Sequence, residues 1–394
     1  MKRVVKLPVG IPADLVPDVL ARLHYSSSDL EGFRLDLEHN CVEYTQRGEE
    51  SAAEVERKIL KVIDKMTDGF KRRRTRILVD RRSVSPRYVD DPMPELERGG
   101  HVRKAGIGQY AFGPLTVRLA AYFEEEFARI GTSLGAVPYR FPTLIDVQKL
   151  SRCGYFSSFS QSACFVTHLR EDVDVIEAFA DAMGRESTTV NPASGQLATT
   201  EHMLSPAVCF HLYAALADRP LSKPLMVAMA QGKCFRYESG NLTGLERLWD
   251  FSMHEVMFVG PSDEVVTLRQ RSMDLFVEFM DSLQMRYRIE TAIDPFFIGD
   301  YATRGTFQSA LELKYEIRLD LPFRKTSIAA GSFNYHQTFF GKSFRIGLSS
   351  SSHHWVHSGC TAMGIERWVF GFLAQYGPDP VRWPAIVRQR VVAA

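Results

Sequence analysis

The sequence lacks an excess of charge of either sign. Its 48 lysines and arginines balance 47 aspartates and glutamates, which leaves a formal net charge of +1. Proteins devoted to gripping nucleic acid usually carry a clear basic excess. The balance therefore argues weakly against that class of function, although a local basic patch can lie beneath a neutral total.

Long apolar runs are also missing. No segment approaches the roughly 18 uninterrupted apolar residues that a membrane-spanning helix requires. The first residues, MKRVVKLPVGIPADLV, contain no apolar stretch leading to a small-residue cleavage site. We therefore expect no transmembrane helix, no contact with a membrane, no secretory signal, and a cytoplasmic protein.

Paired cysteines are absent as well. The six cysteines contain no CxxC pair, and a chain of 394 residues is long enough to fold without disulfide staples. We expect reduced thiols, so any metal site must draw its ligands from positions far apart in the sequence.

What is present indicates an ordinary globular protein of two domains. Hydrophobic residues make up 45% and charged residues 24% of a chain that is longer than one typical domain. We divide it into a small α+β unit at 1–90, a linker at 91–104 and a larger domain at 105–394. Strand-like segments come in runs rather than alternating with helices, which favours an α+β fold with a mostly antiparallel sheet flanked by helices.

The N-terminal unit shows a βαββαβ order, which is typical of a ferredoxin-like sandwich. A basic run at 71–76, KRRRTR, follows its second helix. This run could contact phosphate, but a solvated helix end is the favoured interpretation.

Residues 233–260 form the most informative stretch. Two strand-like runs flank a polar loop with glycines, which predicts a β-hairpin. Arg236 and Glu238 share one strand face, and Phe251 and Glu255 share another. Arginine, carboxylates and an aromatic ring suit a floor for an anionic, planar ligand such as a nucleotide.

A second stretch, HSGCTAMGIERWVFG, begins at residue 357. Its glycines at 359 and 364 bracket a turn from strand to helix, and Arg367 falls in the first helical turn. Close backbone approach and an arginine at a helix start suit a phosphate or a stacked adenine.

Together these segments resemble the class II aminoacyl-tRNA synthetases. FRYE with FSMHE resembles motif 2, and GxxxxGxER resembles motif 3. GPLTVRLAAYFEEEFARIG with VPYRFPTLI resembles motif 1. The resemblance covers about residues 105–380 in the right order. It implies a class II catalytic domain and a homodimer.

Within that class the chain is most similar to seryl enzymes. KYEIRLDLP and AAGSFNYHQTFFGKSF resemble two seryl-type strands, with Asn334 in register, and TTE ending at Glu201 resembles the TxE element that reads the amino acid. One departure stands out: Ser, Ile, Ala and Ala occupy 327–330, where the seryl pattern carries an acidic metal ligand. Mg²⁺ is therefore expected with ATP, but these residues do not support its usual ligand arrangement.

The resemblance extends to a zinc site. Methanogen-type seryl-tRNA synthetases and the related amino acid:carrier-protein ligases hold zinc with a Cys/Glu/Cys trio, which implies Cys209, Glu255 and Cys360 here, at similar spacings of 46 and 105 residues. Three protein ligands leave one tetrahedral position open for an amine or water. Without the resemblance, each of these cysteines would be interpreted as a small buried hydrophobe, as the other four still are.

The same resemblance implies residue roles. Arg236 would hold the α-phosphate of ATP, and Arg367 would cover the adenine or bind the γ-phosphate. The remaining expected contacts are, for the nucleotide, Glu238, Arg247, Trp249 and Phe251, and for a small amino acid such as glycine, alanine or serine, Glu201, Glu255, Asn334 and His336.

Three functions remain open. The leading one is AMP-forming activation of a small amino acid and its transfer to the phosphopantetheine thiol of an acyl or peptidyl carrier protein. Residues 1–104 lack the sustained heptads of a tRNA-gripping coiled coil, and the charge of +1 offers little grip on a polyanion, so tRNA is not the expected partner. The alternatives are a zinc-dependent seryl-tRNA synthetase and a non-catalytic synthetase paralogue.

Overall fold

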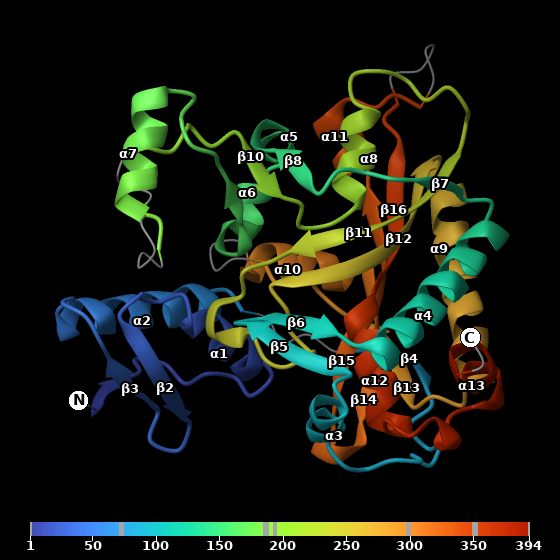
Figure 1. The fold of residues 1–394 in the computed structure, drawn as a ribbon, viewed down its shortest axis with the longest axis horizontal. Helices are drawn as coiled ribbons and strands as arrows, with labels where there is room; N and C mark the ends of the chain where they lie inside the picture. Colours follow the sequence, from blue (N-terminus) through green and yellow to red (C-terminus); the bar gives the residue numbers. More distant parts are fainter. Residues whose placement is uncertain are drawn as a thin grey trace.

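The structure, a computed structural model, describes residues 2–70, 75–183, 189–191, 195–296, 301–348 and 354–392 (Figure 1). Most of the basic run predicted at 71–76 lies outside these residues. Among the described helices, none combines the length and apolar character needed to cross a membrane.

One eight-stranded sheet dominates the molecule. Its strand order is β4-β13-β14-β15-β16-β12-β11-β7. The pairings are antiparallel except for that of β7 with β11. This confirms the predicted α+β fold with a mostly antiparallel sheet. In sheet order the strands are β4 (Ile77–Asp80), β13 (Tyr287–Thr291), β14 (Lys314–Leu321), β15 (Thr326–Gln337), β16 (His357–Gly364), β12 (Asp250–Gly260), β11 (Met226–Phe235) and β7 (Val137–Tyr139).

Alternating side chains divide the central strands between two cores. Along β12, Val256 and Phe258 face one core, while Met257 and Val259 face the other. The first core is closed by three long helices, α4 (Pro114–Ser133), α9 (Ser262–Ser282) and α12 (Ile365–Tyr376), whose aromatic side chains pack around the fully buried Trp368. Proline in the first turn of α4 is favourable, because its missing N–H would have no partner within the helix there.

The opposite face carries the candidate site. Short elements cover it and form the second core, among them α8, which begins at Cys209. They are a three-stranded sheet of β8 (Leu144–Asp146), β10 (His202–Leu204) and β9 (Phe165–Val166), with the helices α5 (Val147–Arg152), α6 (Tyr155–Phe159), α8 (Cys209–Ala215) and α11 (Phe339–Phe344). The other helices outside the N-terminal unit are α7 (Val173–Met183), α10 (Tyr301–Ala310) and α13 (Ala385–Val392).

The N-terminal unit lies at one side of the large sheet (blue in Figure 1). Its three strands, β1 (Lys2–Lys6), β2 (Leu30–Asp36) and β3 (Cys41–Gln46), pair in the antiparallel order β1-β3-β2. The helices α1 (Val16–Leu23) and α2 (Ala52–Thr67) pack on them around a separate core. The serine at 51 caps α2 by accepting from the Glu54 N–H at 3.3 Å.

The last strand of the predicted βαββαβ order is β4, and it is part of the large sheet instead of the N-terminal sheet. β4 pairs with β13 in the large sheet, and Leu78 and Val79 pack against the first core. The N-terminal sheet therefore has three strands rather than four, because burial against the larger core decides where β4 pairs. The boundary at residue 90 stays a prediction, and this pairing favours an earlier end, after α2.

The segment predicted as a linker, 91–104, is structured. It contains α3 (Met93–Arg98) and most of β5 (Val102–Gly106), which forms a hairpin with β6 (Gln109–Phe112). Leu96 and Val102 are buried in the first core. The prolines, glycines and charged residues of this segment therefore lie in turns of the larger domain and do not form a free linker.

Candidate active site

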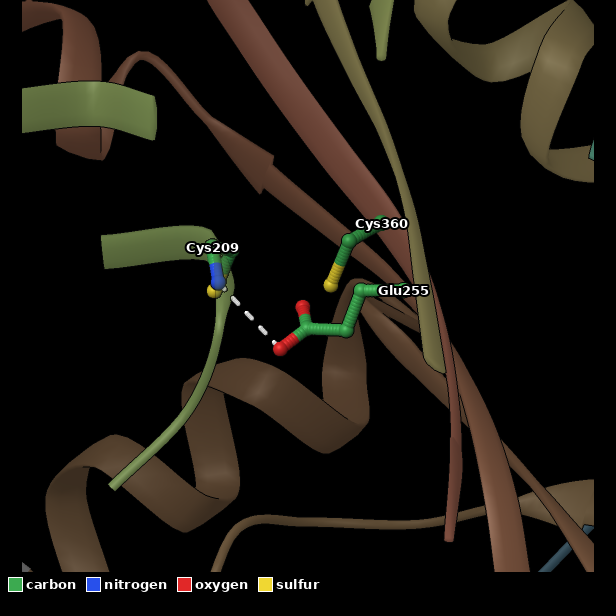
Figure 2. A group of neighbouring side chains, drawn as sticks. All are labelled: Cys209, Glu255 and Cys360. Atoms are coloured by element: carbon green, nitrogen blue, oxygen red, sulfur yellow. Dashed lines mark hydrogen bonds between the residues drawn. The ribbon is translucent and has the colours of Figure 1, made fainter. Parts of the chain in front are cut away.

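Two cysteines and a glutamate meet beneath the small elements. The ligand atoms of Cys209, Glu255 and Cys360 all lie within 4.8 Å of one another, and all three residues are buried. Figure 2 shows the two thiols and the carboxylate pointing toward one another from α8, β12 and β16. The three residues expected to bind zinc are thus brought together.

Strand register explains two of these positions. β12 and β16 pair so that Glu255 lies opposite Ala362 and Met257 lies opposite Cys360. Glu255 and Cys360 are therefore diagonal neighbours on one sheet face. The third residue, Cys209, is the first residue of α8. The backbone N–H groups of Val208 and Cys209 donate to Glu255 Oε1 at 2.7 and 3.2 Å, and the second bond is dashed in Figure 2.

Burial makes it costly to ionise the side chains of this cluster. Burial, with the neighbouring Cys360, raises the pKa of Glu255 to about 8. The hydrogen bond with Cys360, burial and the Glu255 carboxylate raise the pKa of the Cys209 thiol well above its ordinary value. Three ionised groups could share this space only with a compensating cation, and a divalent ion bound here would supply that charge.

The residues fit zinc. Two thiolates and one carboxylate are a donor set that zinc prefers, and three protein ligands leave a fourth position open. Around them, the Asn334 amide donates to Cys360 Sγ at 3.4 Å, and His336 Nε2 lies 3.8 Å from the same sulfur. Such surrounding contacts orient metal ligands. Asn334 and His336 therefore lie beside the cluster, and their role in an amino-acid pocket stays a prediction.

The predicted nucleotide residues gather at the end of the β11–β12 hairpin. β11 ends at Phe235, so the prediction that Arg236 and Glu238 share a strand face is wrong: both residues follow the strand. The Nε of Arg236 donates to the Pro206 carbonyl at 2.9 Å. Its guanidinium lies 5.4 Å from the ring centroid of Phe251, the second residue of β12. The cation and the aromatic ring thus form one surface.

Glu238 lies among several arginines. Burial alone would raise the pKa of this carboxyl, but Arg247, with which it forms an ion pair, and Arg367 together hold it below its usual value. Arg247 precedes β12 and lies in the loop. Glu238 is thus an ionised acceptor.

Arg367 lies in the first turn of α12, as the sequence predicted. It reaches back across the sheet, where its Nε donates to the Glu246 carbonyl at 2.7 Å and its terminal nitrogen donates to the Ala329 carbonyl at 2.9 Å. The preceding Glu366 accepts from the Ser252 N–H at 2.9 and 2.8 Å. These bonds fix the start of α12 next to Phe251.

Two predicted residues lie apart from these groups or serve another role. Glu201 has an exposed side chain, and no contact among the described residues joins it to the cysteines. Trp249 donates its indole N–H to Cys164 Sγ at 3.0 Å and packs edge-on against Tyr237 at 4.9 Å, so it supports the loop.

A group of charged side chains beside the cluster was not predicted from the sequence. Lys314 lies opposite Asn334 on β14, and its Nζ is 2.8 Å from Asp294 and 3.1 Å from Glu316. The signal was available, because Lys314, Glu316 and Arg318 alternate along one strand. The same pattern had drawn attention to Arg236 and Glu238.

We expect Lys314→Met to lower the free energy of unfolding by about 3 kcal/mol in urea denaturation at neutral pH. Lys314 is 8% exposed, and its removal leaves two carboxylates without their buried cation. Lys233→Met is the matched control, because Lys233 pairs with Asp250 at 3.0 Å with a side chain 48% exposed. That change should cost less than about 1 kcal/mol. Equal losses would contradict the prediction.

Comparison with solved structures defines the class. A crystal structure of M. kandleri seryl-tRNA synthetase with A. aeolicus tRNASec matches with a TM-score of 0.73 at 21% identity, over 100% of this chain and 77% of that one. Cytoplasmic serine-tRNA ligase from Naegleria fowleri, solved with AMP, matches with a TM-score of 0.61 at 14% identity, over 81% and 72%. The chain has the class II synthetase fold.

Sequence relatives define the family. Amino acid–acyl-carrier-protein ligase 1 of Bradyrhizobium diazoefficiens is 30% identical over 309 residues, which cover 76% of this chain and 90% of that protein. Type-2 serine–tRNA ligase of Methanothermobacter thermautotrophicus is 29% identical over 315 residues, 77% of this chain and 60% of that protein. The chain belongs to the family that contains these two groups of ligases. It matches only about 60% of the length of the type-2 enzymes. No family model matches the sequence.

Proposed function

We propose that the protein activates a small amino acid with ATP and transfers it to the phosphopantetheine thiol of a carrier protein. One observation supports the activation step. The segment Pro206–Cys209 accepts from Arg236 at one end and donates to Glu255 at the other. The phosphate-binding arginine and the metal ligands are thus adjacent, as a reaction between ATP and an amino acid requires.

In the first step an oxygen of the amino acid's carboxylate attacks the α-phosphorus of ATP, and pyrophosphate leaves with Mg²⁺. Arg236 donates to the α-phosphate and stabilises the charge that develops there. Glu238 accepts from the adenine amino group, Phe251 stacks beneath the ring, and Arg367 covers the opposite side, with Arg247 nearby.

The amino acid is held on the other side of Pro206–Cys209. Zinc, when bound by Cys209, Glu255 and Cys360, supplies an open coordination position suited to a neutral amine. Asn334 and His336 line the space for the side chain. Simple carboxylic acids, which lack the amine, should therefore be poor substrates.

In the second step the carrier thiol attacks the carbonyl carbon of the adenylate, and AMP leaves. Two observations support a carrier protein as the acceptor. The carrier-protein ligase relative aligns over 90% of its own length, whereas the type-2 tRNA ligase aligns over 60%. The net charge of +1 also gives little attraction to a polyanion.

Transfer to tRNA is the second candidate. It is favoured by the structural match to the M. kandleri enzyme, which covers 100% of this chain, N-terminal unit included. The deciding experiment offers one labelled preparation of activated amino acid to bulk tRNA and to a holo carrier protein. Label on the carrier protein supports the proposal, and label on tRNA overturns it. If no proteinogenic amino acid supports pyrophosphate exchange into ATP, the chain is a non-catalytic paralogue.

We further expect a homodimer built on the motif 1 elements. β7 is an edge strand with Val137 58% exposed and Tyr139 42% exposed, and Val117 on the neighbouring α4 is 50% exposed. Apolar side chains on an open edge favour pairing with another chain. Val137→Asp should convert a dimer to a monomer in light scattering. Val381→Asp, at a valine 73% exposed outside these elements, should not. A monomeric wild type would contradict the prediction.

A further inference from the structure

The loop that carries Glu238 and Arg247 rests on the N-terminal unit. Asn241 in this loop donates its amide to the carbonyl of Ala21, in the last turn of α1, at 2.9 Å and to the Glu238 carbonyl at 3.0 Å. One side chain therefore bonds both to a helix of the N-terminal unit and to the backbone of the residue expected to read adenine.

Two further hydrogen bonds join the same parts. Ser239 Oγ donates to the His24 carbonyl at 3.4 Å, and the Tyr25 hydroxyl donates to the Tyr237 carbonyl at 3.4 Å. The last carbonyls of a helix have no partner within the helix. The end of α1 therefore offers acceptors that the loop occupies.

Steric fit adds a contact that does not depend on hydrogen bonds. A Cβ at Gly240 would overlap the His24 imidazole. That ring packs against Phe33 on β2 with centroids 4.7 Å apart, so it has support on its far side. A side chain at 240 must therefore displace the loop or the N-terminal unit.

We propose that the end of α1 positions the nucleotide loop, which makes the N-terminal unit a structural part of the ATP site. Gly240 and Asn241 are positioning residues, and the His24 ring is the surface of the N-terminal unit against which Gly240 fits. They hold Glu238 and Arg247 where an incoming adenine meets them, so that ATP binding does not bear the cost of ordering this loop. The inference rests on the proposed function because it assigns the loop to ATP.

A double-mutant cycle tests the contact. Gly240→Ala should weaken ATP binding about tenfold in calorimetric titration, which corresponds to about 1.4 kcal/mol. It should raise KM for ATP in pyrophosphate exchange while kcat and KM for the amino acid change little. Adding His24→Ala removes the overlapping ring and should restore most of the affinity, although His24→Ala alone has little effect.

Asn40→Ala supplies the matched control. Asn40 donates its side-chain amide to the Leu7 carbonyl at 3.0 Å inside the N-terminal unit, away from the loop. Loosening the unit there should leave ATP affinity unchanged. The proposal is overturned if Asn40→Ala weakens ATP binding as much as Gly240→Ala does, or if the double variant shows no recovery.

Hydrogen exchange separates this inference from the proposed function. Amides of residues 237–242 should exchange slowly in the wild type and faster in Gly240→Ala, whether or not any amino acid is activated. A wild type that binds ATP and shows this change but never exchanges pyrophosphate refutes the proposed activity alone. Unchanged exchange at these amides, or a wild type that binds no ATP, overturns the positioning role.

Discussion

Cys209→Ser and Cys360→Ser should each abolish zinc binding and amino-acid activation together. The two sulfurs are buried in one cluster with Glu255, and serine cannot replace a thiolate as a zinc ligand at neutral pH. Loss of a residue that merely surrounds a metal site costs about 10- to 100-fold. Loss of a ligand should cost at least that much in amino-acid-dependent pyrophosphate exchange, with zinc counted by elemental analysis.

Cys234→Ser is the matched control for the cysteine variants. Cys234 is fully buried on β11, which pairs with the strand that carries Glu255, but it is not a member of the cluster. The Cys234→Ser variant should therefore still bind zinc. Glu255→Gln should lose activation and keep ATP binding, because its contacts are with Val208 and Cys209 rather than with the nucleotide arginines. Full activity in a metal-free preparation would contradict the zinc site.

Arg236→Ala should lower kcat for pyrophosphate exchange by about 10²- to 10³-fold, the effect expected when one donor to a developing charge is lost. The side chain is already oriented by the Pro206 carbonyl and lies against Phe251. Arg236→Lys should recover little, because an ammonium cannot reproduce the planar fork of a guanidinium. Rapid-quench measurement of adenylate formation checks the chemical step directly.

Arg81→Lys is the control for this substitution. Arg81 forms a two-pronged ion pair with Asp281, with distances of 3.0 to 3.2 Å, on a surface away from the hairpin. Its replacement should change stability slightly and leave kcat unchanged. If Arg236→Ala retained wild-type kcat, the assignment of the α-phosphate to this residue would fail.

Strand and helix patterns in the sequence predicted where some candidate residues lie, but not which groups they contact. Arg367 follows from a glycine-bounded helix start. Glu255 and Cys360 were implied only by the resemblance, and the register of β12 and β16 explains why they lie on one sheet face. Trp249 is different, because its neighbours Cys164 and Tyr237 come from separate segments. No local pattern predicts such a contact.

The sequence by itself determined the α+β class, because hydrophobic period encodes it locally. The synthetase motifs and the three metal-ligand candidates came from the resemblance of the sequence to known ligases, not from residue spacing alone. Only the tertiary structure decided that β4 joins the large sheet, that residues 91–104 are ordered, and that α1 contacts the loop containing Asn241. These outcomes depend on which surfaces bury most area against each other, and on groups more than 200 residues apart, such as Ala21 and Asn241. The spacing of residues along the chain does not show which of these surfaces pack together.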